Sequence, residues 1–225
     1  LNRATPLLAL ALLLSCTSSA CIQTTLAQAG ELSDGSRFSS WFFGDAEDWI
    51  RTTDGKRILR VATGLAVLVP LSYFDQQESE AALNWGNGGL GNFLRLTNHA
   101  GGPYALSVPA AVFSISLMGN NEKFQDAAFT SLQAPIYAGV VAIFVKTAFG
   151  RSRPEAGRGA RDFNPFTDIN SAFPSGHATA AFAILAPWTF YYPNIFTYSL
   201  LTIGTGTAIA RMERQKHWLT DVLAG

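Results

Sequence analysis

A chain of 225 residues is long enough for one sizeable domain, and its charges balance, with 16 basic and 16 acidic side chains. This balance excludes a broad basic surface of the kind that binds nucleic acid. We therefore expect no nucleic-acid partner, and any anion site must be local.

The first 29 residues have the composition of a secretory signal peptide. They contain one basic residue, Arg3, no acid, and an apolar stretch over 7–14 that is followed by small residues. The small residues suit cleavage after Ala29 or after Ala20, and an uncleaved N-terminal helix is the alternative. The segment therefore predicts that the chain is exported.

Both cysteines, Cys16 and Cys21, lie inside the same segment. A lipid anchor on one of them is a weaker alternative, because Leu14 and Ser18 are less usual at the positions they would occupy in a lipoprotein signal. Cleavage after Ala29 would leave the mature chain without cysteine, so no disulfide enters the expected fold.

Segment 30–56 combines acidic residues with aromatic ones such as Trp41 and Trp49. This composition predicts an amphipathic N-terminal element that packs on the main body, or else lies on a membrane surface. The remainder, 57–225, is expected to form the functional domain.

Uncharged runs then indicate helices over 61–74, 104–119 and 127–145, and a fourth uncharged run covers 178–210. Prolines divide the fourth run into two helices joined at 191–194. The sequence contains no alternating strand pattern of useful length, so the predicted fold class is all-α.

The chain ends at Gly225 within a pattern, 217–225, that would continue as a helix. We therefore expect the helical bundle to lack its last helix at the C-terminus.

The apolar runs fall between a buried core helix and a membrane span. A span needs about 20 apolar residues, and the run at 127–145 has 19, while the mean hydropathy of the chain is only +0.16. We expect a helical domain that faces the periplasm and associates with the membrane, and the sequence leaves spanning open.

Three polar clusters stand at the ends of these helices. In the first, Lys146, Arg151 and Arg153 precede Pro154, and cations suit a helix C-terminus. Pro154 predicts that the helix ends just after Arg153, which would hold Arg153 and Lys146 about two turns apart. A solvated helix end is the alternative interpretation. The loop 155–172 that follows suits a lid or a substrate contact, or an irregular connection.

The second cluster is Pro174-Ser175-Gly176-His177, at the start of the fourth run. Ser175 is a good N-cap, and Gly176 allows a ligand to approach the backbone. The unpaired N–H groups of a helix N-terminus bind anions, phosphate above all. A capped helix with a surface histidine is the alternative.

The third cluster contains Arg211, His217 and Asp221. On a helix, His217 and Asp221 would face the same way, so the carboxylate could orient the imidazole as a nucleophile, base or metal ligand. A hydrogen bond between His217 and Asp221 on the protein surface, without a catalytic role, is the alternative interpretation. The remaining histidine, His99, lies in a loop of glycine and proline and is expected to be structural.

Taken together, the clusters resemble the three-part signature of the type 2 phosphatidic acid phosphatase (PAP2) superfamily, which includes class A acid phosphatases and vanadium haloperoxidases. The matching positions are Lys146-x6-Arg153-Pro154, Pro174-Ser175-Gly176-His177 and Arg211-x5-His217-x3-Asp221. One departure is Ala210, where the family usually has Ser, and that position is peripheral.

The resemblance implies a PAP2-type helical bundle and a phosphatase that needs no metal or other cofactor. His217, oriented by Asp221, would attack phosphorus to give a phosphohistidine, and His177 would protonate the leaving group. The residues implied to bind the phosphate are Lys146, Arg153, Ser175, Gly176 and Arg211.

The implied substrate is a phosphorylated lipid or a small phosphate ester, with lipids of the phosphatidic acid, phosphatidylglycerol phosphate or undecaprenyl diphosphate type favoured. A vanadate-dependent haloperoxidase is one alternative, disfavoured by the short chain and its signal. A non-catalytic envelope protein that binds anionic lipid is another, disfavoured because binding alone needs only the cations and not two histidines.

Overall fold

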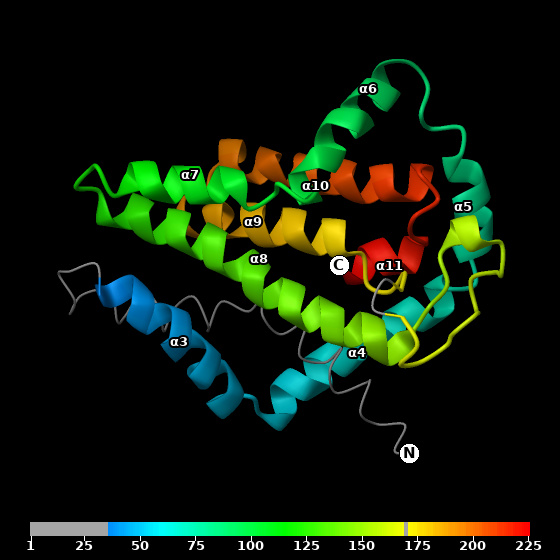
Figure 1. Cartoon of the computed structure of the whole chain (residues 1–225), viewed down its shortest axis with the longest axis horizontal. Helices are drawn as coiled ribbons and strands as arrows, with labels where there is room; N and C mark the ends of the chain where they lie inside the picture. The colour runs from blue at the N-terminus through cyan, green and yellow to red at the C-terminus, as the bar shows by residue number, and fades with distance from the viewer. Residues whose placement is uncertain (1–35, 169–170) are drawn as a thin grey trace. The chain divides into compact units, whose positions relative to one another are not determined.

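The computed structural model describes residues 36–168 and 171–225, so the predicted signal peptide lies outside the described residues. The described residues fall into two compact units, one that ends at Leu65 and one over 66–225. The described residues are mostly helical (Figure 1). Among them we find no β-strand, which confirms the all-α prediction.

The first unit contains helix α3 (Ser36–Arg51) and most of α4 (Gly55–Leu71). Helix α3 buries the apolar side chains of Phe38 and Trp41 but exposes those of Phe43 and Ile50. The Phe38 and Trp41 rings meet edge to face, with their centroids 5.8 Å apart.

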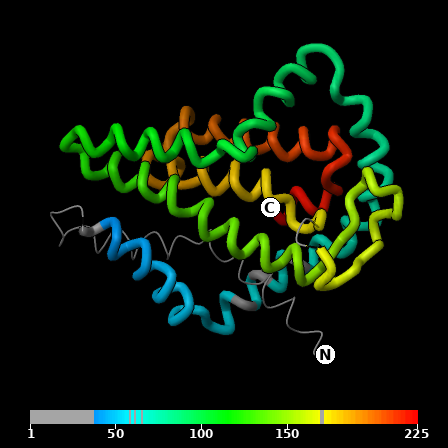
Figure 2. The backbone as a smooth tube through the Cα atoms, in the orientation of Figure 1, coloured from blue at the N-terminus to red at the C-terminus, as the bar shows by residue number. Residues whose placement is uncertain are grey.

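The second unit carries the three polar clusters. Helix α8 packs along α9, α9 packs along α10, and α7 packs on α8, which gives a bundle whose long helices run side by side (Figure 2). Its helices are α5 (Asp75–Ala82), α6 (Gly88–Thr97), η1 (Asn98–Gly101), α7 (Ser107–Ser116), α8 (Glu122–Phe149), η2 (Pro154–Ala156), α9 (Gly176–Tyr191), α10 (Ile195–Glu213) and α11 (Leu219–Ala224).

The break between α9 and α10 occurs where the sequence predicted it. Asn194 caps α10 with a capping box, in which its side chain accepts from Thr197 N at 3.2 Å and its own backbone N–H donates to Thr197 Oγ1 at 3.3 Å. The two helices then pack closely, because a Cβ at Gly204 would lie only 3.0 Å from the Phe182 ring.

The end of α8 differs from the prediction. The helix ends at Phe149 rather than near Arg153, because Gly150 adopts the left-handed conformation at φ 57° and donates its N–H to the Lys146 carbonyl at 2.8 Å. A side chain at Gly150 would also collide with the Asn164 carbonyl. Arg153 is therefore extended, and it is not on the same helix as Lys146.

Two helices were not predicted. The charged stretch 75–80 follows the predicted helix over 61–74, and it forms most of α5. The glycines around 86–89 lead directly into α6. Both helices pack against α10.

Among the described helices, α8 alone is long and apolar enough to cross a membrane, and the bent pair α4 and α5 would add a second span if taken as one. A core helix of a soluble protein satisfies the same criterion. This is weak support for the predicted membrane association.

Candidate active site

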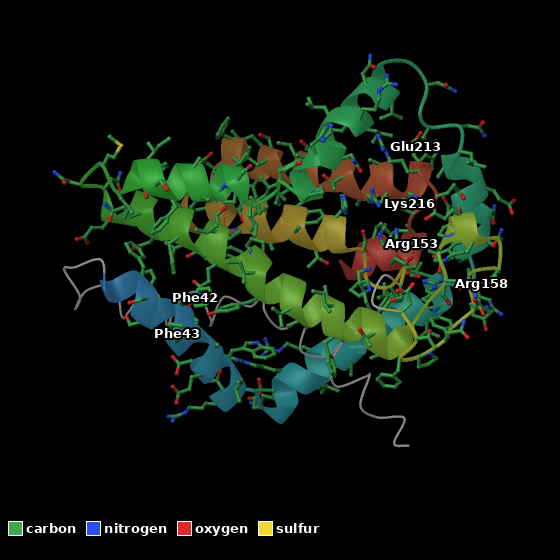
Figure 3. The ribbon with its side chains drawn as sticks, in the orientation of Figure 1. Phe42, Phe43, Arg153, Arg158, Glu213 and Lys216 are labelled. Atoms are coloured by element: carbon green, nitrogen blue, oxygen red, sulfur yellow. The ribbon has the colours of Figure 1, made fainter. Side chains whose placement is uncertain are left out.

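The three polar clusters come together at one end of the bundle, where α8 ends, α9 begins and α10 turns into α11. Figure 3 shows Arg153 and Lys216 at this end. The pKa of His177 also indicates that residues of all three clusters lie close together. The pKa of His177 is lowered to about 4, first by burial and then by four neighbouring groups: Arg211, His217, Arg153 and Lys146.

The floor of the site is the N-terminus of α9. Ser175 is its N-cap, as predicted, and its Oγ accepts a hydrogen bond from Ala178 N at 3.5 Å. Ser175 N donates to the Asp221 carbonyl at 2.8 Å, which ties this loop to α11. The first N–H groups of a helix have no acceptor within the helix, so those of Gly176 and His177 are suited to an anion.

Lys146 lies beside this helix start. A Cβ added at Gly176 would lie 3.7 Å from Lys146 Cε, and Lys146 Nζ donates to the Ser171 carbonyl at 2.7 Å. The pKa of Lys146 is lowered to about 8, mainly by burial and then by the charge of Arg153. A bound anion would offset this repulsion.

Arg211 projects from the last turn of α10 and is buried. Its Nη1 donates to Asn98 Oδ1 at 3.2 Å, whereas its buried Nε has no hydrogen-bond partner among the described residues. Burial, followed by the charge of Arg153, lowers its pKa to about 10. A buried N–H without a partner is costly, and a phosphate oxygen would satisfy it.

His217 does not lie on a helix with Asp221, which corrects the prediction. Helix α10 ends at Glu213, and Gln215 turns the chain with φ 55°. The Gln215 amide holds this turn by donating to the Ser79 carbonyl at 2.6 Å. His217 therefore lies between α10 and α11.

A backbone carbonyl fixes the tautomer of His217. Its Nδ1 lies 2.7 Å from the Ala172 carbonyl, which can only accept, so Nδ1 carries the proton and Nε2 keeps a free lone pair. Asp221 Oδ2 lies 3.7 Å from Nδ1, too long for a hydrogen bond. Burial lowers the pKa of His217 to about 4, against the opposite influence of the Asp221 charge.

A cavity of about 440 Å³ opens beside this site. The predicted contact loop 155–172 contributes to it. Among its lining residues are Arg153, Arg158, Asn164, Thr167, Asp168 and Ser171.

Two buried charged residues behind the site were not assigned from the sequence. Arg151 was predicted as one cation of the first cluster, with no role of its own. Asp75 is the first residue of α5. An acid directly after an apolar run was the only signal for Asp75. His99, by contrast, is exposed in η1.

Within residues 36–168 and 171–225, no three His, Cys, Asp or Glu side chains group as they would to hold a metal ion. The anion site described above is built from cations and backbone N–H groups.

Residues 128–225 match the family model described as the PAP2 superfamily. Two curated relatives, the lipid A 1-phosphatases of Rhizobium johnstonii and Rhizobium etli, are each 29% identical to the chain over 94 residues. The match covers 40% of this chain and 38% and 40% of those proteins, so the chain spans about two fifths of their length. No solved structure matches the chain.

If Arg211 provides the unpartnered donor, Arg211→Gln should weaken vanadate or orthophosphate binding by about 10- to 100-fold, because a hydrogen bond to a charged group contributes about 1.5–3 kcal/mol. Isothermal titration calorimetry measures this. Arg214→Gln removes an exposed cation three residues away and serves as the matched control. Wild-type affinity in Arg211→Gln would show that Arg211 does not bind the anion.

Proposed function

Because residues 128–225 belong to the PAP2 superfamily, we propose that the chain is a phosphatase that hydrolyses a phosphate monoester or diphosphate of a lipid. The observation that carries the proposal is the gathering of Lys146, Arg153 and Arg211 around a helix N-terminus, beside two histidines. A bound anion would offset the repulsion among these three cations, and His217 adds a nucleophile.

In the first step, the Nε2 lone pair of His217 attacks phosphorus in line. The P–N bond forms as the bond from phosphorus to the leaving oxygen breaks. The protonated form of His177, which the bound phosphoryl group favours by raising the pKa, gives that oxygen a proton. His217 Nδ1 keeps its hydrogen bond to the Ala172 carbonyl, and the nearby Asp221 carboxylate stabilises the positive charge that the imidazole gains.

The phosphoryl oxygens are held by the cations and by the start of α9. Arg211 and Arg153 suit two oxygens at once through their planar guanidinium groups, and Lys146 supplies a point charge. The Gly176 N–H donates a hydrogen bond. Ser175 Oγ accepts from Ala178 N, so its own O–H remains able to donate to the phosphate.

In the second step, water breaks the P–N bond. His177, now neutral, accepts a proton from the water as its oxygen attacks phosphorus, and His217 leaves with its lone pair restored. Phosphate departs, and both imidazoles return to their starting state.

A lipid substrate is supported by two observations. The relatives named above are lipid A 1-phosphatases, and α8 exposes large apolar side chains such as Val140, Ile143 and Phe144. Phosphatidic acid, phosphatidylglycerol phosphate and undecaprenyl diphosphate are the substrate types that we propose. The enzyme would act in the bacterial cell envelope, facing the periplasm and associated with the membrane.

We expect His217→Ala to lose phosphatase activity altogether, because the proposed covalent route needs the Nε2 lone pair of His217. His177→Ala should lose about 10²–10⁴ in kcat, the usual contribution of a general acid. The loss should be greatest with phosphatidic acid, whose alkoxide leaves poorly, and smallest with p-nitrophenyl phosphate. Phosphate release from both substrates measures this.

His99→Ala is the control, since His99 is exposed and outside the site; we expect it to stay within about twofold of wild type. Wild-type rates for His217→Ala would refute the mechanism. Bromide oxidation by vanadate-loaded protein without phosphate release would indicate a haloperoxidase, and lipid binding without turnover a binding protein.

The pH dependence follows from the lowered pKa values. His217 and His177 both have a pKa of about 4 in the empty site, so both are neutral at pH 7 and gain protons only as the pH falls through about 4. A bound anion offsets the cations near His177 and should raise its pKa toward 6.5.

NMR titration of labelled histidines, with and without vanadate, measures these values, and His177→Gln and His217→Gln assign the signals. Imidazoles that titrate at 6.5 or above in the empty protein, unchanged by vanadate, would contradict this account.

A further inference from the structure

A buried ion network lies directly behind His217. Asp75 and Asp221 are fully buried, and Arg151 between them is 3% exposed. Arg151 Nη2 donates to Asp75 Oδ2 at 2.6 Å, and Arg151 Nη1 donates to Asp221 Oδ1 at 2.7 Å. One guanidinium therefore joins two carboxylates that are far apart in the sequence.

Arg151 has no donor left for a substrate. Its Nε and Nη2 donate to the Ala160 carbonyl at 2.9 and 2.7 Å, and its Nη1 donates to Thr220 Oγ1 at 2.8 Å. With the two carboxylate contacts, this accounts for all five N–H groups of a guanidinium. Although Arg151 lies between Lys146 and Arg153 in the sequence, it is not one of the proposed phosphate-binding residues.

Asp75 also holds the start of α11. Its Oδ1 accepts from Thr220 N at 2.9 Å, and its Oδ2 accepts from Thr220 Oγ1 at 2.7 Å. Asp75 thus satisfies an N–H of the first turn of a helix from 145 residues away. Because His217 lies two residues before α11, the position of this helix sets the position of the imidazole.

The sharing of Arg151 decides how Asp221 is oriented. A free Arg–carboxylate pair tends to be bidentate, with both carboxylate oxygens engaged. Here Arg151 Nη2 donates to Asp75, so only Arg151 Nη1 donates to Asp221, and it does so through Asp221 Oδ1. Oδ2 is left to accept from Trp218 N at 2.8 Å and to lie 3.7 Å from His217 Nδ1.

We propose that Asp75 is a positioning residue for the reaction, which acts through Arg151 and Thr220 to hold Asp221 Oδ2 against His217. The inference rests on the proposed function. It assigns a role to a residue outside 128–225, the part of the chain that the family model matches.

The test is Asp75→Asn, which keeps the size of the side chain and removes its charge. We expect kcat on p-nitrophenyl phosphate to fall about 10- to 100-fold, the loss usually seen when a metal-ligating side chain loses the hydrogen-bond partner that orients it. Vanadate affinity should stay within about threefold, because the proposed phosphate-binding residues are unchanged. Glu80→Gln, an exposed change on the same helix, is the matched control and should keep wild-type kcat.

A double-mutant cycle separates positioning from general stability. If Asp75 acts through Asp221, the variant Asp75→Asn/Asp221→Asn should be no slower than Asp221→Asn alone, within about threefold. Losses that multiply would overturn the proposal, as would a wild-type kcat for Asp75→Asn. Circular dichroism checks that each variant folds.

Should Asp75→Asn fail to fold, Thr220→Val decides instead, since it removes one link between Asp75 and Arg151 at nearly constant volume. A several-fold lower kcat in the folded Thr220→Val protein supports the proposal, and an unchanged kcat overturns it. His217→Ala is assayed alongside. Activity in that variant refutes the proposed phosphatase mechanism itself, whereas an inactive His217→Ala beside a normal Asp75→Asn refutes only the positioning role.

Discussion

The hydrogen bond from His217 Nδ1 to the Ala172 carbonyl is the interaction on which the site depends. It selects one tautomer and so decides which nitrogen can react. Ala172 is itself placed by its N–H, which donates to the Arg151 carbonyl at 2.7 Å. Arg151 directly follows Gly150, the left-handed residue that ends α8. The end of α8 therefore helps to place the carbonyl that selects the tautomer of His217.

The cations of the site repel one another and are partly removed from water, and both effects are unfavourable. Lys146 and Arg211 are buried enough to have lowered pKa values, and Arg153 adds repulsion to both. In the proposed mechanism, a phosphoryl group that enters the site would offset this repulsion, and the same charges would bind the transferred group most strongly.

Local signals in the sequence were sufficient for some features and not for others. The start of α9 at Ser175 and the break before α10 at Asn194 were predictable, because capping is determined by neighbouring residues. The end of α8 was assigned to Pro154, although the left-handed Gly150 already terminates it. His217 was placed on a helix because the spacing to Asp221 suits one; the turn that removes it is held by α5, a tertiary contact that periodicity does not encode.

Covalent phosphate on His217 is the most direct test of the account. Turnover of a labelled phosphate ester can be stopped under alkaline conditions, since phosphohistidine is labile to acid, and the modified peptide identified by mass spectrometry. The account predicts phosphate on His217 alone, lost in His217→Gln. Phosphate on His177 instead, or steady turnover that never labels a histidine and inverts the configuration at phosphorus, would contradict it.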